Sequence, residues 1–159
     1  MASRFGHFGR PGGPHVVGPT NPGNKSSVEF SESNRRALRL PTDPSSAAVA
    51  RRWMAGKTLP LDDERAEQLK FLANELVTNS IRHAAGSSVC IEIEVRPRAV
   101  RVSILDNGDG GEPTLRPASI WHTNGRGLAL VDRLSSRWGH RTGSGTIVWF
   151  EVDREFTPS

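Results

Sequence analysis

The chain has 159 residues, of which 24% are charged, and its formal net charge is +4. This length is enough for one domain with a buried core. The small positive excess suits an acidic partner or a phosphate ligand, but its lysines and arginines are too scattered to form a nucleic-acid patch. The single cysteine cannot form an internal disulfide, and no apolar run approaches the roughly 18 residues of a membrane span. We therefore expect a cytoplasmic protein that binds neither nucleic acid nor membrane.

The first 27 residues are rich in Gly, Pro, Ser and Asn and contain no acidic residue. A segment with so little to bury is expected to stay disordered. We interpret residues 1–27 as a solubilising tail rather than a docking arm. The ordered domain is expected to span residues 28–155, and residues 156–159 are expected to form a frayed tail.

The first predicted elements are a short strand and two helices. Residues 35–40 alternate toward their end, which predicts a strand closed by a proline. Asp43-Pro44 predicts the start of a helix over residues 44–55, because aspartate caps free N–H groups and proline suits the first helical position. A longer helix is predicted to begin at the acidic turn over residues 61–64 and to end near residue 85.

Two alternating segments then predict an antiparallel hairpin. In residues 89–95 the valines and isoleucines face a core, whereas Glu92 and Glu94 face water. Cys90 lies in this strand, where we expect a small buried hydrophobe. The second strand spans residues 100–106, and its inward phase ends in Asp106. A carboxylate at the inward end of a core strand is costly unless something pairs with it.

Residues 107–124 are glycine-rich at their start and lack periodicity, which is typical of a functional or mobile loop. A helix is predicted next, followed by a turn-rich connection over residues 139–145 and a last strand over residues 146–152. One face of this helix carries Leu128, Val131, Leu134 and Trp138. The order of elements predicts an α/β two-layer sandwich, with a mixed, mainly antiparallel sheet and helices on one face.

Several residues could together bind a nucleotide. An inward Asp106 can accept a hydrogen bond from an exocyclic amine, the group that distinguishes adenine from guanine. Glycines at 108 and 110 let the backbone approach a flat ring. Glycines at 125 and 127, before a helix, leave free N–H groups for phosphate.

The long helix adds two residues on one face, Glu75 and Asn79. The Asn79 oxygen suits a hydrated Mg²⁺ that bridges phosphates, and Glu75 could deprotonate a hydroxyl that attacks the terminal phosphate. Each feature alone is weak, since Asp-Asn-Gly is most often a turn and a polar helix face is usually solvated. Their ordered combination is what carries the interpretation.

Four short motifs, in order, resemble the ATP-binding boxes of the Bergerat-fold ATPases, which include gyrase, histidine kinases and mismatch-repair proteins. They are Glu75-x-x-x-Asn79, Asp106-x-Gly108-x-Gly110, Gly125-x-Gly127-Leu128 and Gly145-Thr146. The resemblance covers about residues 35–153. Its single-domain length, and Glu-Leu-Val-Thr-Asn followed by Arg-His-Ala, make the chain most similar to the bacterial anti-sigma-factor serine kinases.

This resemblance implies the Bergerat ATP-binding fold, ATP and Mg²⁺ as cofactors, and an ATP-dependent protein serine/threonine kinase. The implied partners are a sigma factor, which the protein sequesters, and a STAS-like anti-sigma-factor antagonist, which it phosphorylates on serine. A homodimer is left open. So is the alternative of a non-catalytic nucleotide-binding regulatory module that acts by protein–protein binding. The retention of Glu75 favours the enzyme.

The resemblance also implies a role for each motif residue. Glu75 is the expected catalytic base, and Asn79 is expected to hold Mg²⁺ on the phosphates. The base pocket is expected to comprise Asp106, Gly108, Gly110 and Thr146. The phosphates are expected to meet Gly125, Arg126 and Gly127, under a lid formed by residues 111–124, and Leu128 is expected to be a further cofactor-binding residue. Ala129 departs from the pattern, because many relatives have a further glycine there.

Overall fold

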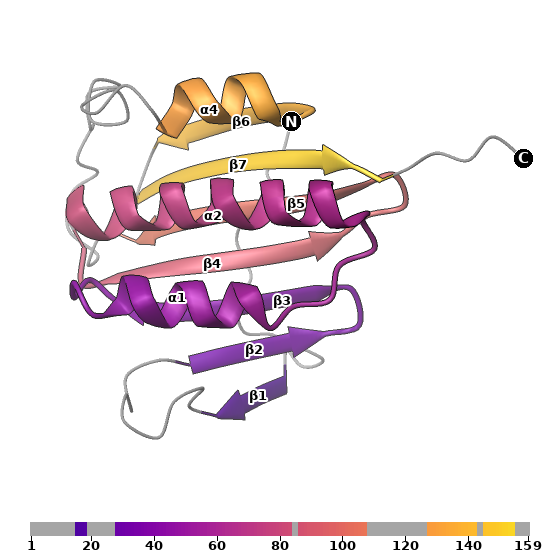
Figure 1. Cartoon of the computed structure of the whole chain (residues 1–159). Helices are drawn as coiled ribbons and strands as arrows, with labels where there is room; N and C mark the ends of the chain where they lie inside the picture. The colour runs from indigo at the N-terminus through magenta and orange to yellow at the C-terminus, as the bar shows by residue number, and fades with distance from the viewer. Residues whose placement is uncertain (1–14, 19–27, 84–85, 108–126, 143–144, 155–159) are drawn as a thin grey trace, which may run out of the picture.

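The computed structural model describes residues 15–18, 28–83, 86–107, 127–142 and 145–154. These residues form a two-layer α/β sandwich in which the helices lie over one face of a seven-stranded sheet (Figure 1). The helices are α1 (Ser46–Ala55), α2 (Asp63–His83) and α4 (Gly127–Leu134). The strands are β1 (His15–Gly18), β2 (Val28–Glu32), β3 (Arg35–Pro41), β4 (Ser88–Val95), β5 (Ala99–Asn107), β6 (Arg137–Thr142) and β7 (Gly145–Asp153). The predicted two-layer fold is therefore confirmed.

The strands are ordered β1-β2-β3-β4-β5-β7-β6 across the sheet. Every pairing between described strands is antiparallel, so the predicted mixture of strand directions is wrong. The cause lies in the connections. Between β3 and β4 the chain passes through both α1 and α2, and this second helix returns it to the end of the sheet from which β3 left (Figure 1).

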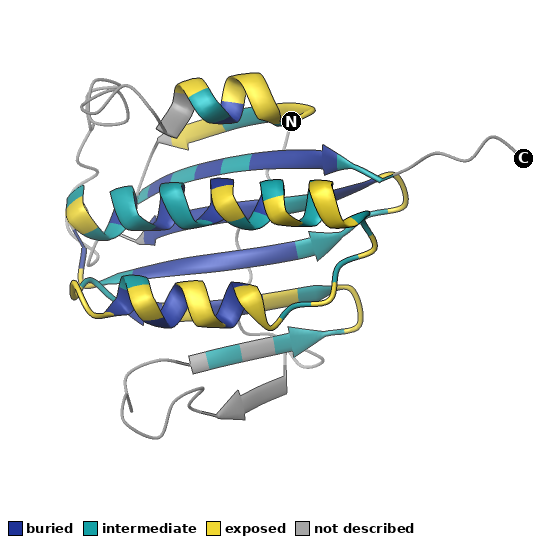
Figure 2. Ribbon diagram, viewed as in Figure 1, coloured by how far each residue is buried: buried dark blue, intermediate teal, exposed yellow. Residues whose placement is uncertain are grey.

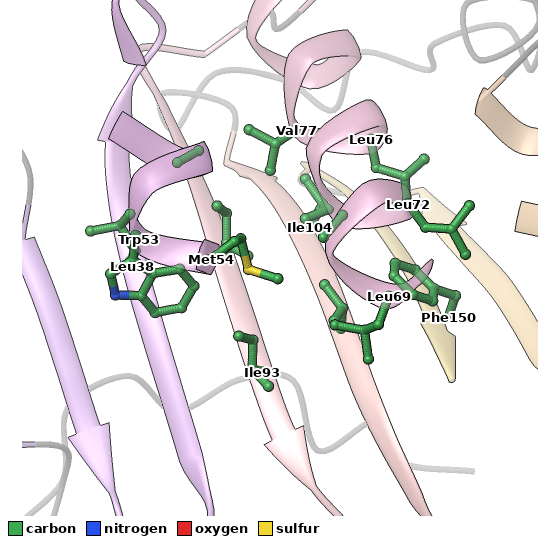
Figure 3. Close-up of a cluster of buried hydrophobic side chains, with 14 of the residues drawn as sticks. Leu38, Trp53, Met54, Leu69, Leu72, Leu76, Val77, Ile93, Ile104 and Phe150 are labelled. Carbon is green, nitrogen blue, oxygen red and sulfur yellow. The ribbon is translucent and has the colours of Figure 1, made fainter. Parts of the chain in front are cut away.

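The core lies between the helices and the sheet, where the inner sides of both layers are buried (Figure 2). Helix α2 contributes Leu69, Leu72 and Leu76, whose spacing places them on one face. They pack with Ile104 and Phe150 from the sheet (Figure 3). Full burial of one such side chain contributes about 1.5–3 kcal/mol. This apolar layer is what positions the polar residues found at one end of the sandwich.

The sheet face away from the helices carries ion pairs. Glu92 is only 6% exposed and its carboxylate lies 3.5 Å from Arg35, so the prediction that Glu92 faces water is wrong. Burial raises the pKa of Glu92, and the charge of Arg35 opposes that rise. Cys90, on the same face, is buried as predicted.

Several boundaries differ from the sequence-based expectations. Helix α1 begins at Ser46 rather than at residue 44, because the Asp43 carboxylate accepts hydrogen bonds from the N–H (2.8 Å) and O–H (2.6 Å) groups of Ser45 in a turn before the helix. Residues 15–18, within the predicted disordered tail, form β1. None of the described helices is long and apolar enough to cross a membrane.

The largest local difference follows α4. The predicted helix included Trp138, but α4 ends at Leu134, and residues 137–142 form β6 instead of a turn. Trp138 pairs with Phe150 on β7 and still packs against the core. Its indole N–H donates to the Asp132 carboxylate at 2.9 Å. The apolar character of Trp138 was therefore interpreted correctly, but its secondary structure was not.

Candidate functional site

Asp106 and Thr146 form the floor of the candidate site. They are partners in the β5–β7 register, and they are 4% and 3% exposed. Two residues further into the sheet, Ile104 pairs with Val148, and both belong to the core under the helices. Because side chains alternate along a strand, Asp106 and Thr146 point to the same helix-covered side. The predicted inward phase of Asp106 is confirmed.

The polar face of α2 turns toward α4. Gln68 Nε2 donates a hydrogen bond to the carbonyl oxygen of Leu134, at the end of α4. Glu75 and Asn79 lie seven and eleven residues after Gln68, which places them on the same side of the helix. Both are half-buried. Glu75, the predicted catalytic base, and Asn79, the predicted Mg²⁺ ligand, therefore lie along the side of α2 that faces α4.

The N-terminus of α4 lies at the same height along α2 as Glu75 and Asn79. The two helices run in opposite directions (Figure 1), and Gly127 lies seven residues before Leu134. At 1.5 Å per residue this is about 10 Å, which is the same distance along α2 that separates Gln68 from Glu75. The first turn of α4, with its free N–H groups, thus lies beside Glu75 and Asn79.

Ser80 adds a buried hydroxyl near this end of α2, and the sequence-based interpretation gave it no part in the site. It lies on the buried side of α2 and is 1% exposed. Among the described residues its Oγ has no hydrogen-bond partner. The sequence-based interpretation grouped Ser80 with the small and apolar residues of this helix because its side chain is small. The signal available in the sequence was its position next to Asn79, on the helix face that covers the sheet.

These residues gather at one end of the sandwich. The end of α2, the end of β5 and the start of β7 lie on the same side of the molecule (Figure 1). Gly127 and Leu128 are the first two residues of α4, and Gly145 begins β7. The predicted contacts at Gly108, Gly110, Gly125 and Arg126, and the predicted lid over residues 111–124, lie outside the described residues.

The arrangement fits a nucleotide base with phosphates. The inward rows of β4, β5 and β7 are apolar along the core, as at Ile91, Ile104 and Val148. At this one end, the inward layer instead holds a carboxylate and two hydroxyl groups, from Asp106, Thr146 and Ser80. Buried polar groups are costly unless they find partners. A base with a polar edge would supply such a partner for the Ser80 hydroxyl.

Comparison with known proteins assigns the fold to a class. The two-layer sandwich is that of an ATP-binding domain. The chain belongs to the histidine kinase-like ATPase domain family, whose model matches residues 40–152.

Two curated relatives are similar to parts of this chain. The chain is 24% identical over 131 residues to the anti-sigma F factor of Pasteuria penetrans, which covers 72% of this chain and 87% of that protein. It is 31% identical over 96 residues to the sensor protein LytS of Streptococcus mutans serotype c, which covers 48% of this chain. The match spans only 17% of the LytS sequence.

Proposed function

We propose that the chain is an ATP-dependent protein serine/threonine kinase of the anti-sigma-factor type. In this proposal it binds ATP with Mg²⁺, transfers a phosphoryl group to a serine of a STAS-like antagonist, and sequesters a sigma factor when the antagonist is absent. The match to the anti-sigma F factor, which covers 72% of this chain, supports this assignment. The match to the ATPase family supports the nucleotide.

One observation carries the proposal: the buried carboxylate of Asp106 lies at the end of the sandwich where the Glu75–Asn79 face of α2 meets α4. In the bound state, Asp106 accepts a hydrogen bond from the exocyclic amine of adenine, and Thr146 and Ser80 contact the base edge. Asn79 would hold Mg²⁺ on the phosphates, where the bound ion would supply neutralisation of the charge on the phosphate oxygens.

The transfer step follows from the position of Glu75. The hydroxyl oxygen of the acceptor serine attacks the terminal phosphorus, and the bond from that phosphorus to the bridging oxygen of ADP breaks. The Glu75 carboxylate accepts the proton that the serine loses. Glu75 is one helical turn before Asn79, so the base and the metal ligand reach the terminal phosphate from one helix face.

A phosphoryl-transfer assay tests the proposal. The purified chain is incubated with γ-labelled ATP, Mg²⁺ and a panel of STAS-like domains, and labelled residues are identified by mass spectrometry. We expect label on a serine of at least one domain. Glu75→Gln is expected to abolish transfer while ATP binding remains. Glu67→Gln, an exposed glutamate two turns earlier on α2, is the matched control and should transfer normally.

The outcomes separate the alternatives. Transfer that survives Glu75→Gln would remove the assigned base. ATP binding without transfer to any acceptor, together with a stable complex with a partner, would support the non-catalytic regulatory module. The serine and sigma-factor parts of the proposal fail in that case, but the nucleotide site does not.

A further inference from the structure

A concave region lies at the other end of the sandwich from Asp106. It is a cavity of about 510 Å³ between the β2–β3 turn, the α1–α2 connection and the end of β4. Val95, which lines it, is six residues along β4 from Val89, the register partner of Asp106. At about 3.3 Å per residue the two sites are about 20 Å apart. The cavity is therefore separate from the nucleotide site.

The cavity has an apolar floor. Ile93 and Val95 from β4 and Leu59 from the α1–α2 connection line it. Ile93 belongs to the core, and Leu59 packs against the core. The volume falls within the range of about 300–1,000 Å³ that is typical of small-molecule pockets. An apolar body of limited size fits this floor.

The rim is positively charged. Arg35, Arg36 and Lys57 line it, with Glu29 as the one carboxylate among its lining residues. The Lys57 ammonium lies 2.9 Å from Glu29 and 4.5 Å from the ring centroid of Trp53, which holds it at the edge of the cavity. Arg35 forms ion pairs with Glu92 and Glu94 on the sheet face away from the helices.

Arg36 differs from the other two cations. Its guanidinium donates to the Ser31 hydroxyl, and among the described residues it makes no ion pair. A neutral partner leaves its charge uncompensated, and an anion placed over the floor would form a charge-assisted hydrogen bond with it. Lys57 lies on the same rim, where Glu29 already pairs with its charge. The polar groups are thus arranged around an apolar base, as in binding sites for organic ligands.

We propose that this cavity is a second ligand site, for a small organic anion with an apolar body and a carboxylate or phosphate group. The apolar part lies on Ile93 and Val95, and the anionic group is bound by Arg36 with Lys57 beside it. The site is independent of the nucleotide pocket and of the kinase assignment.

Nuclear magnetic resonance titration of the ¹⁵N-labelled full chain tests the proposal with a matched set of probes. 4-Phenylbutyrate and phenyl phosphate carry the two anionic groups, 4-phenylbutanol lacks the charge, and acetate lacks the apolar body. We expect both aromatic anions to shift amide signals around residues 33–36, 56–59 and 93–95. Phenylbutanol and acetate should bind at least tenfold more weakly. A difference between the two aromatic anions assigns the carboxylate or phosphate preference.

Arg36→Gln should weaken binding of the preferred anion by about tenfold or more, the loss of one charged hydrogen bond. Arg133→Gln, an exposed arginine on α4, should not change it. Saturating ATP should leave the anion's affinity unchanged. No binding of either anion at millimolar concentration, an unchanged affinity in Arg36→Gln, or displacement by ATP would overturn the proposal. None of these results bears on phosphoryl transfer.

Discussion

Gly139 on β6 leaves room for the indole ring of Trp149, its partner on β7. A Cβ atom at this glycine would lie 2.7 Å from Cζ2 of Trp149 and 2.9 Å from its Nε1. The ring cannot move freely, because the Arg101 guanidinium lies over it at 4.0 Å from the centroid. We expect Gly139→Ala to lower the free energy of unfolding by about 1–3 kcal/mol, the usual cost of overpacking.

Urea unfolding measures this change, and Gly56→Ala is its control. Atoms near a Cβ at Gly56 lie at an ordinary 3.7 Å, and its φ of −78° is accessible to alanine. Gly56→Ala should therefore be neutral or slightly stabilising. Equal effects of the two substitutions would contradict the assigned cause.

Cys90 is predicted to be chemically inert in the folded protein. It is 3% exposed, and burial raises the pKa of its thiol to about 12. Since the thiolate is the reactive form, iodoacetamide at pH 8 should leave the native chain unmodified and should label it after denaturation. Mass spectrometry reads the result directly, because the chain has one cysteine. Native labelling at the denatured rate would show that the thiol is exposed.

Two residues of the floor show what the sequence could and could not reveal. Alternation along residues 100–106 was enough to predict that Asp106 points inward, since burial of one face fixes the phase of a strand. Ser80 gave no such signal. A serine on the inner side of a helix is read as a small core residue, and its hydroxyl becomes conspicuous only when its surroundings are known.

A side-chain hydrogen bond joins α2 to α4, because Gln68 donates to the carbonyl oxygen of Leu134. Carbonyls in the last turn of a helix lack partners within the helix, so this bond both satisfies Leu134 and fixes the end of α4. Gln68→Ala should cost about 0.5–1.5 kcal/mol. It should also speed amide hydrogen exchange in α4 more than in the core-facing part of α2.

Glu67→Ala is the control for this substitution, because Glu67 is the exposed neighbour of Gln68 on the same helix. It changes the exposed surface of α2 and leaves the Gln68 side chain in place. If both variants accelerate exchange in α4 equally, the hydrogen bond does not hold the helix.

Elements with a clear hydrophobic period were predicted well. Elements that form only because they pair with a neighbouring strand were not. The alternation in β4 and β5 and the apolar face of α2 are visible in the sequence. β6 is not, because its six residues include a glycine, a histidine and two arginines without alternation. It is an edge strand that exists through its pairing with β7, and charged edge strands of this kind are common.

At the scale of the whole molecule, ion pairs link the segments on the sheet face away from the helices. Glu151 lies within 3.1 Å of Arg96, Arg101 and Arg137, which come from three different segments. Burial by itself raises the pKa of Glu151, but hydrogen bonds from Arg137 and Arg101 outweigh it and hold the pKa below the ordinary 4.5. The carboxylate is thus ionised more readily in the folded chain than in the unfolded one.

This difference sets a pH dependence. A depressed pKa in the folded state gives stability that is present above pH 4.5 and lost as the pH falls through the folded value. The wild-type chain should therefore lose stability below pH 4.5 more steeply than Glu151→Gln. Urea unfolding at a series of pH values measures both slopes. Parallel curves for the two proteins would show that Glu151 does not contribute to acid sensitivity.

We propose that α2, β5, β7 and α4 enclose one nucleotide, with Asp106 binding its base. Calorimetric titration of the full chain with ATP and Mg²⁺, and then with GTP, tests it most directly. We predict one ATP per chain, weaker binding of GTP, and a loss of ATP affinity of about tenfold or more in Asp106→Asn, with no loss in the exposed Asp63→Asn control. Equal ATP affinity in wild type and Asp106→Asn, or no heat from a folded wild-type sample, would contradict the account.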